Sequence, residues 1–193
     1  TQLPASGAGV GPDPPPTLSF NISALALRDA AFVDGLSQRC QASGLEPSRV
    51  IFELTETSAM EDPVKSLDIL TRLRMKGFQL SIDDFGTGYS SMLQLVRLPF
   101  SEIKIDKSFV ATALRSTESL AVVRSIIELG RSLHMRVVGE GVEDASTLRL
   151  LRELGCEIVQ GYLLGAPSRG EELVERLSQA PAASIWSTLE PQE

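Results

Sequence analysis

Six short apolar runs of the sequence each finish in polar residues that buried strands seldom carry. These residues are Asn21, Glu53, Asp83 with Asp84, Lys104, Glu140 and Gln160. Several lie between apolar neighbours, as Lys104 does between Ile103 and Ile105. Because strand side chains alternate between two faces, the apolar neighbours can pack under helices while the polar group points the other way. We interpret the set as one ring of functional groups at the mouth of a barrel.

The ring consists mainly of carboxylate and amide oxygens, which suit hard cations such as Mg²⁺ or Mn²⁺. The sequence has one histidine, His134, which we interpret as structural, so a zinc site of the usual histidine and cysteine type is not expected. Consecutive carboxylates at Asp83 and Asp84 can hold one metal ion each or bridge two ions. Two ions roughly 3.5–4 Å apart clamp the attacking and leaving oxygens of a phosphoryl transfer.

The remaining groups fit hydrolysis of a phosphodiester. Lys104 can supply a cation for developing phosphate charge or fix a water molecule, and a further carboxylate near the mouth can deprotonate that water. No arrangement of Ser with His or of Cys with His is visible, so we expect no covalent intermediate. The stretch DDFGTGYSS at 83–91 has two interpretations: an ordinary turn capped by Ser90 or Ser91, or a mobile loop beside the metal site.

Strand and helix patterns alternate along the sequence. The predicted strands are 17–22, 49–54, 78–83, 101–105, 136–140 and 157–160. The predicted helices lie near 29–43, 62–76, 90–97, 116–134, 144–154 and 170–179. This alternation predicts an α/β fold with a parallel sheet, which is either doubly wound or a barrel. The first strand lacks the glycine-rich turn of a doubly wound fold, and polar groups at many strand ends are typical of a TIM-like barrel.

The composition is ordinary for a globular domain, with 42% hydrophobic and 22% charged residues. The net charge of −7 argues against binding of a nucleic-acid polymer, and no apolar run is long enough for a membrane helix. Cys40 and Cys156 are predicted to be reduced, buried thiols, which favours a cytoplasmic setting, even if upstream segments tether the parent protein to a membrane. We predict a Pro/Gly-rich linker or loop over 1–16, a barrel domain over 17–180 and a C-terminal tail over 181–193.

Six ordered blocks of the sequence resemble the signature motifs of EAL domains, a family of bacterial cyclic di-GMP phosphodiesterases. The blocks are FNIS at 20–23, ELTET at 53–57, DDFGTGYSS at 83–91, KIDKSFV at 104–110, GEGVE at 139–143 and QGYLLGAP at 160–167. The resemblance implies a TIM-like barrel that hydrolyses cyclic di-GMP to linear pGpG with two Mg²⁺ or Mn²⁺ ions in second-messenger signalling. Ca²⁺ is expected to inhibit, because it tolerates looser coordination and is a weaker Lewis acid than Mg²⁺.

The resemblance also implies roles for residues of the ring. The implied metal ligands are Asn21, Glu53, Asp83 and Asp84, with Asp84 shared with the second ion. Lys104 would position the attacking water and neutralise charge. Glu140 would be the leading candidate for general base, with metal-activated hydroxide as the alternative for that role.

Residues beside the ring receive roles from the same resemblance. Glu143 and Gln160 would sit next to the metal ions and the substrate. Glu56 would anchor the loop 85–91, whose conformation couples homodimer formation to activity in such proteins. The family usually has Ala at the position of Gly139, which is a small change.

The sequence departs from the family pattern at its front. The Glu-Ala-Leu motif that names the family lies on its first strand and supplies a metal ligand, but no such strand precedes Asn21. The pattern also has six β/α units, whereas a closed barrel has eight. We therefore expect an EAL-type barrel that is incomplete at its N-terminus. Two alternatives remain, a non-catalytic cyclic di-GMP receptor that signals by conformation or dimer contacts, and an unrelated metal-dependent TIM-barrel hydrolase.

Overall fold

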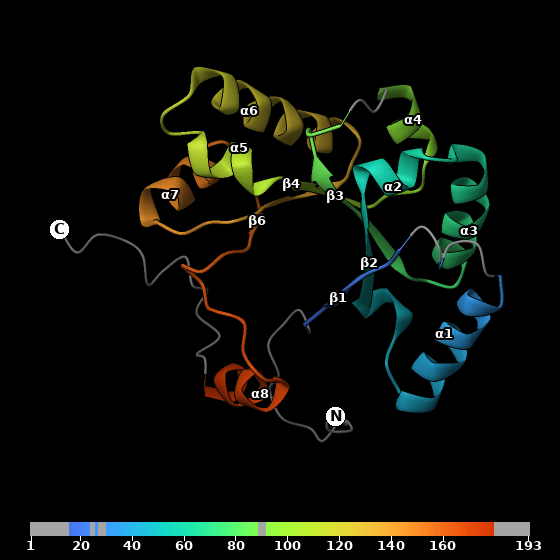
Figure 1. Cartoon of the computed structure of the whole chain (residues 1–193). Coiled ribbons are helices and arrows are strands. Elements are labelled where there is room, and N and C mark those ends of the chain that lie inside the picture. The colour runs from blue at the N-terminus through green and yellow to red at the C-terminus, as the bar shows by residue number, and fades with distance from the viewer. Residues whose placement is uncertain (1–15, 24–25, 27–29, 89–91, 180–193) are drawn as a thin grey trace.

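The computed structural model of the chain describes residues 16–23, 26, 30–88 and 92–179 (Figure 1). The predicted linker, apart from Pro16, and the predicted tail lie outside these residues, so the domain boundaries at 17 and 180 stay predictions. None of the described helices is long and apolar enough to cross a bilayer.

Strands and helices alternate in the described part of the chain. The strands are β1 Leu18–Asn21, β2 Val50–Thr55, β3 Gln79–Phe85, β4 Glu102–Ile105, β5 Arg136–Gly139 and β6 Ile158–Val159. The helices are α1 Ala30–Ser43, α2 Glu56–Met60, α3 Pro63–Met75, α4 Met92–Arg97, α5 Lys107–Thr112, α6 Thr117–Ser132, α7 Ala145–Glu153 and α8 Gly170–Gln179, with a 3₁₀ turn at Pro47–Arg49.

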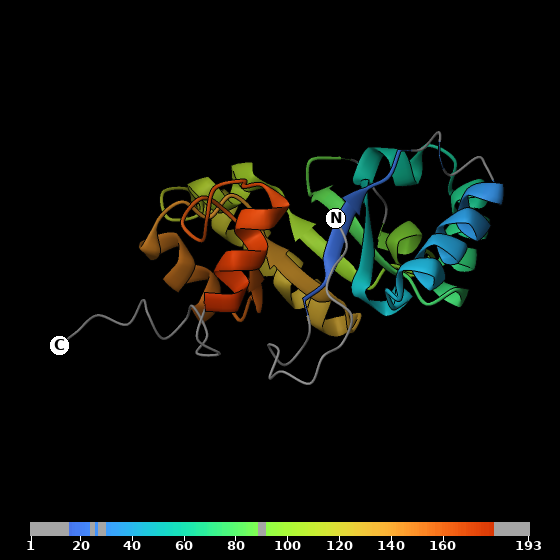
Figure 2. The ribbon, with the colours of Figure 1, turned by 90° about the horizontal axis from the view of Figure 1, so that it is seen from below.

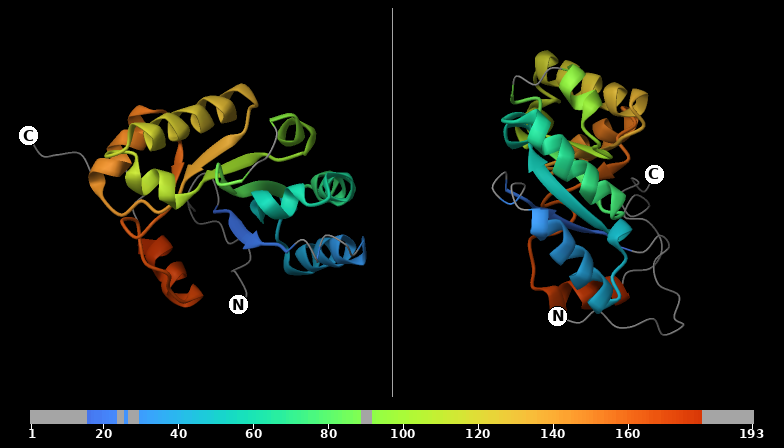
Figure 3. Two further views of the ribbon diagram at one scale, coloured as in Figure 1. Left: turned by 45° about the horizontal axis from the view of Figure 1, so that its top comes forward. Right: turned by 90° about the vertical axis from the view of Figure 1, so that its right-hand side faces the viewer.

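All six strands form one parallel sheet in the order β1-β2-β3-β4-β5-β6. β1 forms one edge of the sheet, next to β2 (Figure 2). Figure 3 shows the helices in an arc around the strands, from α1 at one end to α8 at the other. A parallel sheet with sequential strand order and helices outside is the partial TIM-like barrel that the alternating pattern predicts. The carboxyl ends of all strands therefore meet at one rim.

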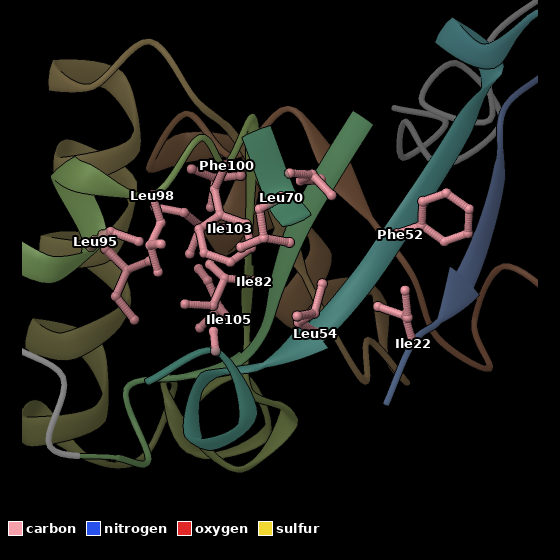
Figure 4. Packing of buried hydrophobic residues seen from close by; sticks show 14 of the residues in the cluster. Ile22, Phe52, Leu54, Leu70, Ile82, Leu95, Leu98, Phe100, Ile103 and Ile105 are labelled. Carbon is pink, nitrogen blue, oxygen red and sulfur yellow. The ribbon is translucent and has the colours of Figure 1, made fainter. Parts of the chain in front are cut away.

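The hydrophobic core lies between the sheet and the helices that cover it (Figure 4). From the sheet, Ile82, Ile103 and Ile105 are fully buried, and they pack with Leu70 of α3 and Leu95 of α4. Burying a side chain of this size contributes about 1.5–3 kcal/mol. Because Ile103 and Ile105 point to the helices, the residues between and beside them on β4 point to the barrel interior.

Two short helices were not predicted from the sequence, and both begin directly at a strand end. The side chain of Thr55 caps α2 by accepting a hydrogen bond from the amide of Ser58. Asp106 caps α5 in the same way, with Oδ1 2.9 Å from the amide nitrogen of Ser108. Such caps satisfy backbone donors that a helix start leaves free. These helices begin the connections that follow β2 and β4.

Candidate metal centre

Lys104 stands at the centre of the polar rim. Its side chain is only 5% exposed, and its Nζ lies 2.6 Å from Glu140 Oε1, 3.0 Å from Glu53 Oε2 and 3.2 Å from Asp83 Oδ1. The three carboxylates come from β2, from β3 and from the residue that follows β5, while Lys104 comes from β4. Four consecutive strands of the sheet therefore bring four predicted site residues into direct contact.

A cluster of three carboxylates lies beside this lysine. One carboxylate oxygen from each of Asp83, Asp84 and Glu140 lies within 4.8 Å of the other two. Oxygen ligands from several carboxylates at such separations suit a hard divalent cation. The described residues therefore fit the Mg²⁺ or Mn²⁺ chemistry expected from the sequence.

An irregularity of β3 allows neighbouring aspartates to face the same centre. In a regular strand Asp83 and Asp84 would point to opposite faces. Here the pairing with β4 shifts register between Ile82 and Phe85, and Asp84 has a φ of 54°. That left-handed conformation costs a non-glycine residue about 1–2 kcal/mol. The carbonyl of Asp84 accepts hydrogen bonds from the amide and hydroxyl of Thr87, which hold the turn.

The electrostatics of the cluster favour a cation. Burial raises the pKa of Glu140, although the contact with Lys104 opposes this effect. Burial also raises the pKa of Asp84, and the carboxylates of Asp83 and Asp106 add to the rise. Burial opposes the charge of Lys104, but its hydrogen bonds with Glu140 and Glu53 raise its pKa above the ordinary value. Crowded carboxylates resist full ionisation with one ammonium partner, and a bound divalent ion would relieve that repulsion.

Gln160, the residue that follows β6, contacts the cluster. Its side-chain Nε2 donates a hydrogen bond of 2.8 Å to Glu140 Oε1. Its backbone amide donates one of 2.9 Å to the carbonyl oxygen of Gly139. Gln160 and Glu143 also line a pocket of about 500 Å³ between the loops after β5 and β6 and helix α8. Lys107, Tyr162 and Leu173 contribute to the same pocket. An open pocket lined by both polar and apolar residues therefore adjoins the carboxylate cluster.

Glu56 contacts the start of the loop 85–91. It is 3% exposed, and its Oε2 accepts hydrogen bonds of 3.0 Å from the amide of Gly86 and 3.2 Å from the amide of Gly88. A Cβ at position 88 would lie 2.8 Å from the Glu56 carboxyl carbon, so the loop follows the carboxylate too closely for a side chain. Residues 89–91, with the predicted caps Ser90 and Ser91, lie outside the described residues.

Asn21 lies on the edge strand β1. It ends β1 in register with Glu53 on β2, at the same rim. Its side chain is exposed, whereas that of Glu53 is buried. His134, which we interpreted as structural, is exposed with a φ of 55° at the turn between α6 and β5.

Sequence reasoning missed two groups near the site. Asp106 belongs to the block KIDKSFV, but the motif gave it no role in the site. In the structure its carboxylate adds to the rise in the pKa of Asp84 that burial causes. Glu102 is 3% exposed and pairs with Arg136 at 3.0 Å. The signal for Glu102 was its spacing of two residues from Lys104, which places both on one face of β4.

Comparisons with known proteins agree with the resemblance seen in the motifs. A model of the EAL domain family matches residues 5–167. The bifunctional diguanylate cyclase/cyclic di-GMP phosphodiesterase MucR from Pseudomonas aeruginosa is 45% identical over 157 residues, which cover 81% of this chain and 23% of MucR. The cyclic di-GMP phosphodiesterase RocR from the same organism is 41% identical over 165 residues, which cover 85% of this chain and 42% of RocR. The chain spans less than half the length of these relatives.

Solved structures show the same likeness. The MucR phosphodiesterase in complex with cyclic di-GMP superposes with a TM-score of 0.77 at 44% identity, over 81% of this chain and 64% of that chain. BlrP1 from Klebsiella pneumoniae, solved in manganese and in calcium complexes with cyclic di-GMP, gives a TM-score of 0.72 at 33% identity, over 76% of this chain and 38% of that chain. With its motifs, its partial barrel and these matches, the chain belongs to the EAL domain family.

Proposed function

We propose that the protein hydrolyses cyclic di-GMP to linear pGpG at the cluster around Lys104, in bacterial second-messenger signalling. The observation that carries the proposal is the convergence of Glu53, Asp83 and Glu140 on one buried ammonium, beside a group of three carboxylates. Relatives that are 41–45% identical to this chain are named as cyclic di-GMP phosphodiesterases. A rim of this kind serves a reaction that concentrates negative charge on phosphate oxygens.

Two Mg²⁺ or Mn²⁺ ions fit the donor set of the rim. The residues proposed to hold them are Asn21, Glu53, Asp83 and Asp84. When bound, such ions supply Lewis acidity to the phosphate and to the attacking and leaving oxygens. The tight contacts of Lys104 with Glu53 and Asp83 support its role as a fixed positive charge that neutralises the phosphate and positions the attacking water.

Glu140 is the proposed general base, which takes the proton of the attacking water. Lys104 and Gln160 both contact its Oε1, so Oε2 is the oxygen we assign to the proton. Burial raises the pKa of this carboxyl, which improves its match to a proton acceptor near neutral pH. Gln160 and Glu143 would contact the substrate from the adjoining pocket, and Glu56 would anchor the loop 85–91.

The direct test is hydrolysis of cyclic di-GMP by the intact protein with Mg²⁺, with pGpG measured by liquid chromatography. Glu140→Ala and Asp83→Ala should each lower turnover by about 100-fold or more, since even outer-shell partners of metal ligands are worth 10–100-fold. Glu128→Ala, on the exposed side of α6, is the matched control and should keep full turnover. Unchanged turnover in either site variant would remove the assignment. Binding without hydrolysis by the wild type would instead indicate a cyclic di-GMP receptor.

Ca²⁺ is expected to inhibit the reaction. It accepts longer and less regular coordination than Mg²⁺ and is the weaker Lewis acid, so it should occupy the carboxylates without supporting turnover. BlrP1 has been captured with cyclic di-GMP in a calcium complex, which agrees with substrate binding in the presence of this ion. Adding Ca²⁺ to a Mg²⁺ assay should lower the rate, and equal rates with the two ions would contradict a tightly positioned two-metal site.

A homodimer through the region of the loop 85–91 is part of the proposal. Helix α4, which follows this loop, exposes Leu93 by 60% and Val96 by 53%. Exposed apolar residues next to each other on one helix mark a candidate association surface. Light scattering of the intact protein should give a dimer, and Leu93→Lys with Val96→Lys should shift it to a monomer. We place the domain in the cytoplasm, in agreement with its two free, buried cysteines.

A further inference from the structure

The loops after β5 and β6 run against each other backbone to backbone. The amide of Val142 donates a hydrogen bond of 3.0 Å to the carbonyl of Gln160, and the amide of Leu163 donates one of 3.1 Å to the carbonyl of Val142. Val142 itself is fully buried. These bonds continue the pairing of β5 with β6 beyond the two residue pairs that the sheet itself provides.

Gly161 is the residue that makes this approach possible. A Cβ at position 161 would lie 2.2 Å from the carbonyl oxygen and 2.3 Å from the amide nitrogen of Val142. The atoms in the way belong to the backbone of a buried residue, so no side chain can turn aside to make room. Any larger residue at position 161 must therefore push the two loops apart.

The same pair of loops carries two groups of the proposed site. Glu140 precedes the Val142 contact by two residues, and Gln160 is adjacent to Gly161. The Gln160 side chain reaches Glu140 Oε1 at 2.8 Å, while the Glu140 amide lies 3.3 Å from the carbonyl oxygen of Ile105 on β4. A displacement at position 161 would therefore change the distance between the side-chain amide of Gln160 and the Glu140 carboxylate.

A second close approach fixes the other side of the loop after β5. Gly141 has a φ of 68°, and a Cβ there would lie 2.7 Å from Cβ of Lys107, the first residue of α5. Because α5 begins just after β4, this contact holds the loop against the strand that carries Lys104. The loop that follows Glu140 therefore makes two close contacts, one at Gly141 and one with Gly161, that leave no room for a Cβ on either glycine.

We propose that Gly161 is a positioning residue for catalysis, which holds Glu140 and Gln160 in the geometry that the reaction needs. This inference rests on the proposed function and extends it to a residue that contacts neither metal ligand nor substrate through a side chain. Gly161 should affect the chemical step, because it positions Glu140, the proposed base. It should not affect metal binding by Asp83 and Asp84 on β3.

The test compares Gly161→Ala with the control Gly35→Ala, whose added Cβ would meet no atom within 4 Å. Gly161→Ala should lower kcat for cyclic di-GMP by about 100-fold, the cost of a misplacement of about 1 Å. KM should change much less than kcat, because Gln160 is only one of the proposed substrate contacts. Its affinity for Mn²⁺, measured by calorimetry, should stay within a few-fold of the wild-type value, because none of the proposed ligands Asn21, Glu53, Asp83 and Asp84 lies on the two displaced loops. Gly35→Ala should retain the wild-type kcat. Wild-type kcat in Gly161→Ala, or a fall that follows a loss of Mn²⁺ binding, would overturn the proposal.

A second measurement does not need the variant to fold or the protein to be active. Amide hydrogen exchange of the wild type should show Val142 and Leu163 protected as strongly as Val138 within β5, although neither lies in a strand. Rapid exchange at both amides would show that the contact is open and would overturn the proposal. If the wild type shows this protection but does not hydrolyse cyclic di-GMP, the proposed function fails while the backbone contact stands.

Discussion

The two ends of β4 carry buried charges of opposite sign, and the charged groups around them differ. At the carboxyl end, Lys104 is surrounded by the carboxylates of Glu53, Asp83 and Glu140. Two residues earlier on the same face, Glu102 is equally buried and pairs with Arg136 of β5. The lower pair is balanced, one charge against one, whereas the rim holds a clear excess of negative charge.

The contrast separates structural charge from functional charge. In the Glu102–Arg136 pair one charge offsets the other and the Arg136 side chain is 38% exposed, so the net contribution to stability is small. An unbalanced cluster is costly unless another cation enters, and such clusters are typical of sites that bind ions or act on substrates. The same strand therefore contributes to an ion pair at one end and to the proposed metal centre at the other.

The largest expected effect comes from removing the lysine at the rim. Lys104→Met should lower the free energy of unfolding in metal-free buffer by about 3–5 kcal/mol, because it leaves buried carboxylates without their partner. Mg²⁺ should restore more stability to this variant than to the wild type, since the ion replaces the missing charge. Urea unfolding with and without Mg²⁺ measures both.

The control for this substitution is an exposed lysine with one partner. Lys76 lies 3.2 Å from Asp34 on the surface, and Lys76→Met should change stability by less than about 1 kcal/mol. Equal losses of unfolding free energy in Lys76→Met and Lys104→Met would show that the carboxylates at the rim do not depend on their lysine more than an exposed pair does.

A substitution at Glu102, at the other end of β4, should lower stability less. Glu102→Gln removes one charge of the ion pair with the partly exposed Arg136 and should cost about 1 kcal/mol or less at neutral pH. Mg²⁺ should stabilise this variant and the wild type equally, because Glu102 is not part of the carboxylate cluster. A Mg²⁺ response that disappears in Glu102→Gln would contradict the division between the two ends.

The difference in unfolding free energy between the wild type and Glu102→Gln should change with pH in one direction. Burial raises the pKa of Glu102 above its ordinary 4.5, with Arg136 opposing the rise. The folded state then binds the proton more tightly than the unfolded chain, so this group contributes its stability below pH 4.5 and loses it as the pH rises through the folded pKa. The advantage of the wild type over Glu102→Gln in urea unfolding should shrink from acid to neutral pH. An advantage that grows over this range would reverse the assignment.

The smallest effect is expected where the rim is changed without changing charge. A Cβ at Gly139 would lie 2.7 Å from Cδ1 of Leu151, the end of a side chain that can shift. The crowding cost and the gain from replacing glycine each amount to about 1 kcal/mol, so Gly139→Ala should be nearly neutral in thermal unfolding. A loss as large as that of Lys104→Met would show that packing, and not charge, makes the rim sensitive.

The arrangement of the elements was accessible from the sequence because hydrophobic periodicity decides it. The six apolar runs became the six strands, and their order follows from the short helical connections. The helices α2 and α5 were missed because they have five and six residues, too few for a periodic pattern. Their signals were the capping residues Thr55 and Asp106, which the sequence shows only as polar residues after a strand.

The site was predictable in membership more than in geometry. Strand ends of a parallel sheet share one rim, so the convergence of Glu53, Asp83, Lys104 and Glu140 followed from the fold class. The turn that brings Asp84 to the same side as Asp83 did not, because it depends on a register shift against β4 and a left-handed backbone. The fit of Gly161 against Val142 likewise depends on a contact between distant segments that no local pattern records.

The ammonium of Lys104 has a consequence for the order of assembly. Held by carboxylates from the ends of three other strands, it serves as an internal counter-ion that is present from the moment the chain folds. Small zinc domains behave differently, because they stay unfolded until their ion arrives. The rim can therefore form before the proposed ions bind, so that loading and release of metal would be reversible events in a protein that is already folded.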